Sequence, residues 1–248
     1  MLAEQRHARI LDMVTSRGSA SVPELAEVLD TSESTVRRDL EKLDSAGKLT
    51  KVHGGATRLG TSSVTRDLTL PERSGMHAAE KLRIARYAAS LVRPDDFVYI
   101  DAGSTTGAMI ELLAQTRATY VTCSVSHALH LVELGCQVIV IGGELKGVTD
   151  ALVGPDALDT LSRYHFSVGF WGANGITAEG GLTTPDRSEA IVKRVSMERC
   201  ERAYVLADAS KLGLVASVTF AELSDATILT DSVPEAFRAY SNVMEVPA

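Results

Sequence analysis

The spacing of apolar residues divides the chain into two regions of different pattern. In the first sixty residues, apolar side chains recur at three- and four-residue steps, which predicts short amphipathic helices. The first helix is expected at residues 5–17, and the capping-box pattern Ser21-x-x-Glu24 opens a second. Ser32 caps the start of a third. The core side of this third helix carries Val36, Leu40 and Leu43.

A strand at residues 49–52 and a turn at Gly54-Gly55 follow these three helices. Three short helices and a hairpin predict a winged helix-turn-helix over residues 1–57, with the third helix in the position that enters the DNA major groove. Residues 58–77 contain Gly, Ser, Thr and Pro but few apolar side chains, so we expect a linker there. Residues 78–248 then form a separate domain.

In that second region, short runs of consecutive apolar residues alternate with helical patterns. The expected strands are 97–100, 119–123, 137–141, 166–170, 203–206 and 226–229. The expected helices are 78–92, 106–115, 126–134 and 187–201. Continuous apolar strands separated by helices are typical of a mostly parallel sheet with both faces covered, so we expect an α/β domain.

The charge is distributed unevenly along the chain. The net charge of -7 is that of residues 61–248, since residues 1–60 hold nine basic and nine acidic side chains. From Lys48 to Arg58 there is no acidic residue. DNA affinity depends on the surface presented to phosphates, so an acidic total does not exclude nucleic acid as a partner.

Other classes of protein are disfavoured by what the sequence contains. The apolar runs are far shorter than the ~20 residues of a membrane span, and the first residues do not form a signal peptide, so we expect a cytoplasmic protein. The three cysteines, Cys123, Cys136 and Cys200, are scattered and read as reduced, packed thiols. His127 and His130 have no partner at ligand spacing, so we expect neither a metal nor a cofactor.

The first candidate site lies on the third helix. Ser34 and Thr35 occupy its first turn and Arg37-Arg38 follow, which suits contacts to base edges and phosphates. Charge on an exposed helix is also common without any ligand, so a solvated basic face remains an equal alternative from these residues alone.

The second candidate site is a set of polar loops that follow predicted strands. Asp101-Ala-Gly-Ser-Thr-Thr106 offers backbone N–H groups, hydroxyls and a helix start to an anion, although such small residues also form turns that bind nothing. Similar loops follow three other strands, at 122–124, 172–175 and 206–211. Because parallel strands end at one edge, these loops predict a pocket for a small polar anion, with Lys211 as a cation and Asn174 as a sugar contact.

Several motifs resemble those of the DeoR family of bacterial repressors. Val22-Pro-Glu-Leu-Ala26, Ser34-Thr-Val-Arg-Arg-Asp-Leu40 and Val52-His-Gly-Gly-Ala56 are similar to its N-terminal signature. The resemblance implies that the third helix reads DNA, as a dimer or tetramer on paired half-sites. The predicted DNA contacts are Ser32, Ser34, Thr35, Arg37, Arg38, Lys42, Lys51 and His53.

The second region is similar to the sensor domain of the same family, which shares the ribose-5-phosphate-isomerase fold. The matching pieces include Asp101 to Thr106, Gly172-Ala-Asn-Gly175 and Asp208-Ala-Ser-Lys211. The resemblance implies a repressor of a sugar-utilisation operon that a phosphorylated sugar releases from DNA. The predicted effector contacts are Asp101, Gly103, Ser104, Thr105, Thr106, Ser124, Asn174 and Lys211.

Finer pieces, such as Gly143-Glu-Leu-Lys146 and Thr183-Thr-Pro185, resemble the fructose-operon repressors of the family, which implies fructose 1-phosphate as effector. One position departs from the pattern. The family usually has Thr-Asn after the second strand, where this chain has Thr122-Cys123, so one effector contact is altered.

Two rival interpretations remain. The first is a sugar-phosphate isomerase with a DNA-binding appendage, for which Asp101, Glu189 and Asp208 are candidate bases. Asn174 opposes it, because the similar isomerases have an acid there. Glu189 and Lys193, one helical turn apart, are equally explained as a surface pair. The second rival is a DNA-binding module with a vestigial sensor.

Trp171, at a strand end, is expected to pack in the core.

Overall fold

The computed structural model describes residues 3–17, 19–45, 48–52, 55–57, 63–64, 69–114 and 116–247. The chain divides into two compact units, which are Met1–Ser63 with Gly213–Val215, and Val64–Leu212 with Ala216–Ala248. After the functions expected of them from the sequence, we call the first the DNA-binding unit and the second the sensor unit.

The DNA-binding unit has the winged helix-turn-helix architecture that the apolar spacing predicts. Its helices are α1 (Ala3–Arg17), α2 (Val22–Val28) and α3 (Glu33–Ser45), and its strands are β1 (Ser19–Ser21), β2 (Thr50–Val52) and β3 (Gly55–Thr57). The strands form an antiparallel sheet in the order β1-β3-β2. A Cβ at Gly55 would lie 2.3 Å from the Ala20 carbonyl oxygen, so only glycine lets β3 approach β1 this closely.

Three helices enclose the core of this unit. Val36, Leu40 and Leu43 of α3 are buried against Ile10 and Val14 of α1 and Leu25 of α2, as the three- and four-residue steps predict. The capping box at the start of α2 is also present, because Ser21 and Glu24 bond to each other's backbone N–H. The helix-stopping residue Gly47 and the turn residue Gly54 lie outside the described residues.

A buried carboxylate joins α1 to α3. Asp39 accepts hydrogen bonds from Arg6 Nε at 2.5 Å and Arg6 Nη2 at 3.1 Å, and lies 2.9 Å from His7 Nε2. Burial alone would raise the pKa of Asp39, but the bonds from Arg6 and His7 outweigh burial and lower it. The helical pattern of α3 does not predict this pair, because its partners lie more than thirty residues earlier.

The range 58–77, predicted as a linker, contains regular structure. Strand β4 (Ser63–Val64) lies within it, and helix α4 (Leu70–Gly75) lies near its end. Helix α4 begins with a capping box, in which Thr69 N donates to Glu72 Oε2 at 2.8 Å. Thr69-x-x-Glu72 is the same sequence signal as Ser21-x-x-Glu24, so the sequence does contain the start of this helix.

The sensor unit is built on a seven-stranded sheet whose described pairs are all parallel. The strands are β5 (Phe97–Ile100), β6 (Thr119–Thr122), β7 (Gln137–Val140), β10 (Val168–Gly172), β13 (Ala203–Leu206), β16 (Thr227–Thr230) and β17 (Val243–Glu245). Their order is β17-β16-β13-β10-β5-β6-β7. The parallel α/β prediction is therefore confirmed, and β17 extends the sheet beyond the predicted strands.

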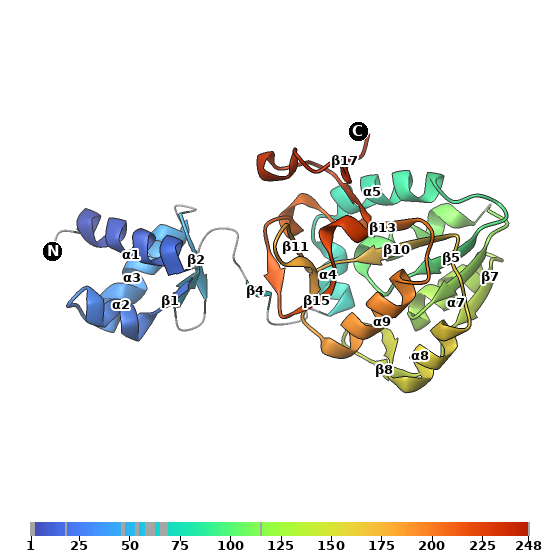
Figure 1. Cartoon of the computed structure of the whole chain (residues 1–248), viewed down its shortest axis with the longest axis horizontal. Coiled ribbons are helices and arrows are strands. Elements are labelled where there is room, and N and C mark those ends of the chain that lie inside the picture. The colour runs from blue at the N-terminus through green and yellow to red at the C-terminus, as the bar shows by residue number, and fades with distance from the viewer. Residues whose placement is uncertain are drawn as a thin grey trace. The chain divides into compact units, whose positions relative to one another are not determined.

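Side chains alternate between two cores along each strand. Val98 and Ile100 of β5 pack in the core beneath α5 (Ala78–Ser90), whereas Tyr99 packs in the core that α8 (Pro155–Ser162) and α9 (Arg187–Met197) cover. Figure 1 shows α5 along one side of this sheet and α8 and α9 along the other. Burial on both faces explains why the strands read as continuous apolar runs.

Trp171 is fully buried, as predicted, and its Nε1 donates to Ser196 Oγ at 2.9 Å. A Cβ on Gly169, two residues earlier, would lie 2.3 Å from the indole ring, so the glycine provides the space that the ring fills. Among the cysteines, Cys123 is buried and Cys136 and Cys200 are half-buried, all three as free thiols.

The remaining elements are short. They are α6 (Ser104–Gly107), α7 (Val125–Glu133), the strands β8 (Glu144–Lys146), β9 (Ala151–Val153), β11 (Gly175–Thr177), β12 (Gly181–Thr184), β14 (Val215–Ala216) and β15 (Val218–Ala221), and the 3-10 turns η1 (Ile110–Leu113), η2 (Ala209–Lys211), η3 (Leu223–Asp225) and η4 (Glu235–Phe237). The predicted helix at 106–115 is replaced by α6 and η1. Thr106 Oγ1 donates to the carbonyls of Asp101 and Gly103, so its hydroxyl stabilises the loop before α6.

Candidate functional site

Four strand ends meet at one edge of the sheet, as the sequence predicts. The neighbours β13, β10, β5 and β6 run parallel, with Gly172 beside Leu206 and Ile100 beside both Phe170 and Thr122. The loops that follow these strands therefore lie next to one another at the carboxyl edge.

A cavity of about 780 Å³, counting its open mouth, lies at this edge. Its lining comes from the strand-end loops, from α9 and from the segment around α4. The lining residues are Arg73, Met76, His77, Lys81, Ala102, Gly103, Ser104, Thr105, Gly172, Ala173, Asn174, Glu189, Lys193, Leu206, Ala207, Asp208 and Lys211. Polar and charged groups that converge on one cavity are typical of a site for a small polar ligand.

Five of the eight predicted effector residues line this cavity, namely Gly103, Ser104, Thr105, Asn174 and Lys211. Asn174 Oδ1 accepts a hydrogen bond from Thr184 Oγ1 at 3.1 Å, which leaves its amide N–H₂ group as a donor toward a ligand. Helix α6 has only four residues, so we attribute attraction for an anion to nearby cations and N–H groups rather than to a helix dipole.

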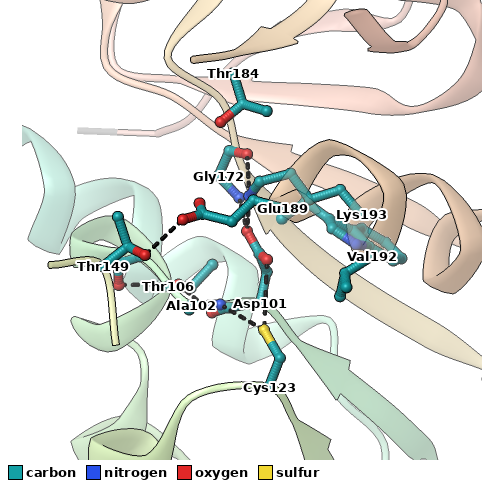
Figure 2. Close-up of polar contacts among 12 residues, drawn as sticks. Asp101, Ala102, Thr106, Cys123, Thr149, Gly172, Thr184, Glu189, Val192 and Lys193 are labelled. Atoms are coloured by element: carbon teal, nitrogen blue, oxygen red, sulfur yellow. Dashed lines mark hydrogen bonds and ion pairs between the residues drawn. The ribbon is translucent and has the colours of Figure 1, made fainter. Parts of the chain in front are cut away.

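Asp101 is held within the protein instead of facing the cavity. It is 2% exposed and forms an ion pair with Lys193 Nζ through Oδ2. The same oxygen accepts from Gly172 N at 3.0 Å, while Lys193 Nζ also donates to the Gly172 carbonyl at 3.1 Å. Figure 2 shows this contact between the end of β5, the end of β10 and α9. Asp101 thus positions the cavity floor.

Thr106 and Ser124 also lie behind the cavity surface. Both are fully buried, and the Thr106 hydroxyl donates to the loop carbonyls already described. Ser124 Oγ donates to Asp150 Oδ2 at 2.5 Å and accepts from His127 N at 3.1 Å, which caps α7. Their hydroxyls are used to shape the loops that carry the cavity-lining residues.

Cys123, where the family pattern has an amide, is buried beneath the same loop. Its sulfur accepts from Ala102 N at 3.3 Å and lies 3.7 Å from Asp101 Oδ1, to which the thiol donates. Burial raises the pKa of Cys123 to about 12, and Asp101 adds to that rise, so the thiol stays neutral. In this structure the departure from the family pattern affects the support of Asp101 and not the cavity wall.

Glu189 and Lys193 are not a surface pair. Both are buried, at 7% and 4% exposure, and each has a different partner. Glu189 Oε1 accepts from Thr149 Oγ1 at 2.5 Å and lies 3.8 Å from Lys146 Nζ, whereas Lys193 pairs with Asp101. In Figure 2 both side chains extend from α9 toward the strand ends. The interpretation as a solvated pair is therefore wrong.

The structure adds three cations that the strand-end pattern does not indicate. Arg73, Lys81 and Lys193 join Lys211, so four cationic side chains and two carboxylates, Glu189 and Asp208, line the cavity among the described residues. Burial lowers the pKa of Lys81; Asp208 opposes this, and Lys211 and Arg73 lower it further. The cations repel one another, and an anionic ligand would relieve that repulsion.

In the DNA-binding unit, the predicted contacts lie along one exposed side of α3. Ser34, Arg37, Arg38 and Lys42 are exposed, Thr35 is half-buried, and Ser32 Oγ accepts from Thr35 N at 3.3 Å as the helix begins. The acids on this side are already paired, Glu33 with Arg37 at 2.9 Å and Glu41 with Lys51 at 3.2 Å. Arg38 and Lys42 have no ion pair with any described residue, and His53 lies outside the described residues.

A metal centre and a membrane span are two other features that the described residues could form. Within the described part of the chain, no three His, Cys, Asp or Glu side chains are grouped to hold a metal ion. Over the same residues, no helix is both long and apolar enough to cross a membrane. His127, one of the two histidines on α7, is buried, which lowers its pKa to about 4, so it is neutral near pH 7.

Both parts of the chain match known family models. Residues 6–62 match the DeoR-like helix-turn-helix domain, and residues 76–232 match the DeoR C terminal sensor domain. Among solved structures, the chain is similar to ribose 5-phosphate isomerase from Methanocaldococcus jannaschii over 53% of each chain, with TM-score 0.41 and 17% identity.

Three relatives are similar over almost their whole length. A transcriptional regulator named FruR from Bacillus subtilis is 38% identical, covering 95% of this chain and 93% of its own. The L-fucose operon activator of Haemophilus influenzae is 35% identical over 95% of each chain. The lactose phosphotransferase system repressor of Streptococcus mutans is 30% identical over 92% of each.

The Asp101–Lys193 pair generates the first prediction. Lys193→Met leaves a buried carboxylate without its cation, and we expect it to lower the free energy of unfolding by about 3–5 kcal/mol. The measurement is urea denaturation of the full chain, followed by a probe in the sensor unit. Lys211→Met, which removes a cation without a described ion pair, is the control and should change stability by less than about 0.5 kcal/mol. Equal stability of the two variants would refute the structural role of the pair.

Proposed function

The chain belongs to the DeoR family of helix-turn-helix transcriptional regulators, and on that premise we propose that it represses a sugar-utilisation operon until a phosphorylated sugar occupies the cavity of the sensor unit. The observation that carries the proposal is the lining of the cavity. Four cations, the Ser104 and Thr105 hydroxyls and the Asn174 amide line one cavity. Cations suit a phosphate, and hydroxyl and amide groups suit a sugar.

The proposed effector is fructose 1-phosphate. Support comes from the sequence pieces similar to fructose-operon repressors, such as Gly143 to Lys146. The relatives include both a repressor and an activator, and repression is the sign we propose for this chain. Neither a metal nor a cofactor is needed for this function, which would be carried out in the cytoplasm.

The proposed operator contacts follow from α3. A helix in the major groove would bring Ser34, Thr35 and Arg38 to base edges or phosphates, and two copies of the chain would read paired half-sites. Arg37 and Lys51, now paired with Glu33 and Glu41, would exchange these surface ion pairs for phosphates at little cost. A homodimer, or a tetramer of two such dimers, is therefore the proposed form.

Arg38→Ala tests the DNA-binding role. If Arg38 binds a phosphate, we expect weaker operator binding and a drop of roughly 0.9 in the slope of log affinity against log salt concentration. Fluorescence anisotropy with an operator fragment at several salt concentrations measures both. Arg163→Ala, at an exposed position of the sensor unit, is the matched control. Unchanged affinity and slope in the Arg38 variant would exclude this contact.

Sugar phosphates test the sensing role. Fructose 1-phosphate at about 100-fold its dissociation constant should stabilise the sensor unit by about 2.7 kcal/mol, seen as a rise of several degrees in melting temperature. It should also weaken operator affinity about 5- to 150-fold. Fructose 6-phosphate, ribose 5-phosphate and unphosphorylated fructose are the comparison ligands. A shift with another sugar phosphate would replace the proposed effector, and no shift with any would favour a vestigial sensor.

One observation favours the rival interpretation as an isomerase. Glu189 lines the cavity, so a carboxylate is present where a base would be needed. Its contact with Thr149 and its proximity to Lys146 instead suit a structural role. We expect no turnover of ribose 5-phosphate or fructose 1-phosphate in a coupled isomerase assay. Turnover that Glu189→Gln abolishes would establish the enzyme.

A further inference from the structure

Helix α4 is the first helix of the sensor unit in chain order, so it follows the segment that leads from the DNA-binding unit. One of its residues, Arg73, lines the cavity. An element that is close to the linker in sequence and touches the ligand site in space is suited to couple the two. The contacts at each end of α4 show how it is attached to the cavity.

The N-terminal end of α4 is bonded to residues 148–150, which we call the hairpin segment because it joins β8 to β9. Leu70 N donates to the Val148 carbonyl at 3.2 Å. The next residue, Thr149, donates to Glu189 of the cavity wall. Asp150 accepts from Ser126 N at 2.9 Å at the start of α7. Three consecutive residues thus connect α4, the cavity and α7.

The C-terminal end of α4 is attached to two other residues of the cavity lining, Lys81 and Ser104. Lys81 Nζ donates to the Arg73 carbonyl and, at 2.9 Å, to Ser104 Oγ. Lys81 is buried at 6% exposure, so this contact is shielded from solvent. Because Ser104 and Lys81 both line the cavity, a ligand bound there would touch the groups that hold α4 in place.

The Arg73 side chain has unused hydrogen-bonding capacity. Its Nε and Nη2 atoms are buried and have no hydrogen-bond partner among the described residues. A buried guanidinium N–H without an acceptor is unfavourable, and a phosphate oxygen is a geometrically matched acceptor. Of the cations that line the cavity, Arg73 is the one whose own helix adjoins the linker in sequence.

We propose that Arg73 binds the phosphate group of the effector and that α4 transmits occupancy of the cavity to the DNA-binding unit. The inference rests on the proposed function, since it requires an anionic effector in this cavity. An effector changes operator affinity only if it binds two states of the protein differently. A phosphate that gains Arg73 in one position of α4 and not in another supplies that difference, and α4 is the helix of the sensor unit that follows the DNA-binding unit in sequence.

The test compares two variants that remove a cation from the same cavity. Arg73→Met removes it from α4, and Lys211→Met removes it from η2. Both should weaken binding of fructose 1-phosphate to the full chain, by roughly 10- to 100-fold, because each loses a charge-assisted contact. Isothermal titration calorimetry measures this affinity. Arg86→Met, at an exposed position of α5 outside the cavity, is the control for loss of a positive charge.

The decisive quantity is the ratio of operator affinities without and with saturating fructose 1-phosphate. We expect this ratio to fall to within about twofold of one for Arg73→Met and to stay in the wild-type range of about 5- to 150-fold for Lys211→Met. Arg73→Lys, which keeps the charge, should recover part of the coupling. Because coupling is reciprocal, operator DNA should change effector affinity by the same ratio in each variant.

Three outcomes would overturn the inference. They are wild-type effector affinity in Arg73→Met, wild-type coupling in Arg73→Met at saturation, and equal loss of coupling in both variants. Failure of the proposed function is seen separately, in the wild-type chain. If fructose 1-phosphate does not bind it, the comparison is repeated with whichever of fructose 6-phosphate and ribose 5-phosphate binds, and if none binds, the inference is wrong together with the sensing role.

Discussion

The sensor site depends on one buried ion pair. Asp101 ends β5, Lys193 comes from α9, and Gly172 ends β10, so the contact among these three residues fixes the positions of two strands and a helix at the carboxyl edge of the sheet. A buried pair of this kind is not a large source of stability, because desolvating both charges offsets most of their attraction. Its value is geometric: with Asp101 held by Lys193 and by Cys123, the loop from Ala102 to Thr106 can present its lining residues in one arrangement.

The remaining charged side chains of the cavity differ in whether an opposite charge is paired with them. Lys193 is largely neutralised by Asp101, and Glu189 is bonded to the hairpin segment, whereas Lys81 donates to neutral oxygens only and Lys211 has no ion pair among the described residues. A site that keeps four cations near one another, with Asp208 and the already bonded Glu189 as its acids, is unfavourable for the empty protein. A bound anion reduces the repulsion among these cations. The cavity therefore favours an anionic metabolite over a neutral sugar.

Much of this could be predicted from local sequence patterns, and the rest depends on long-range contacts. Period-3.6 spacing predicts α1 and α3, and apolar runs predict β5, β6 and β10, because each signal is contained in a few adjacent residues. Because these strands are predicted to be parallel, the sequence also predicts that the four loops after them lie at one edge of the sheet. The sequence does not reveal that Lys81 and Arg73 reach this edge, since both lie before the first sheet strand. Nor does the sequence distinguish Ser104, which lines the cavity, from Ser124, whose hydroxyl caps α7. Both are serines in a loop that follows a strand.

The acidic net charge can be reconciled with DNA binding by the same reasoning about local surroundings. On α3 each exposed acid named above has a basic partner one turn away or on the adjacent strand, so the side that carries Arg38 and Lys42 presents unpaired positive charge. The excess of acid belongs to residues 61–248, where it repels phosphates except at the sheet edge that gathers cations. In the proposed function, this distribution of charge directs two anions to two places: DNA to α3 and a small anion to the cavity. In the proposed mechanism, α4, the first helix of the sensor unit in chain order, connects the two.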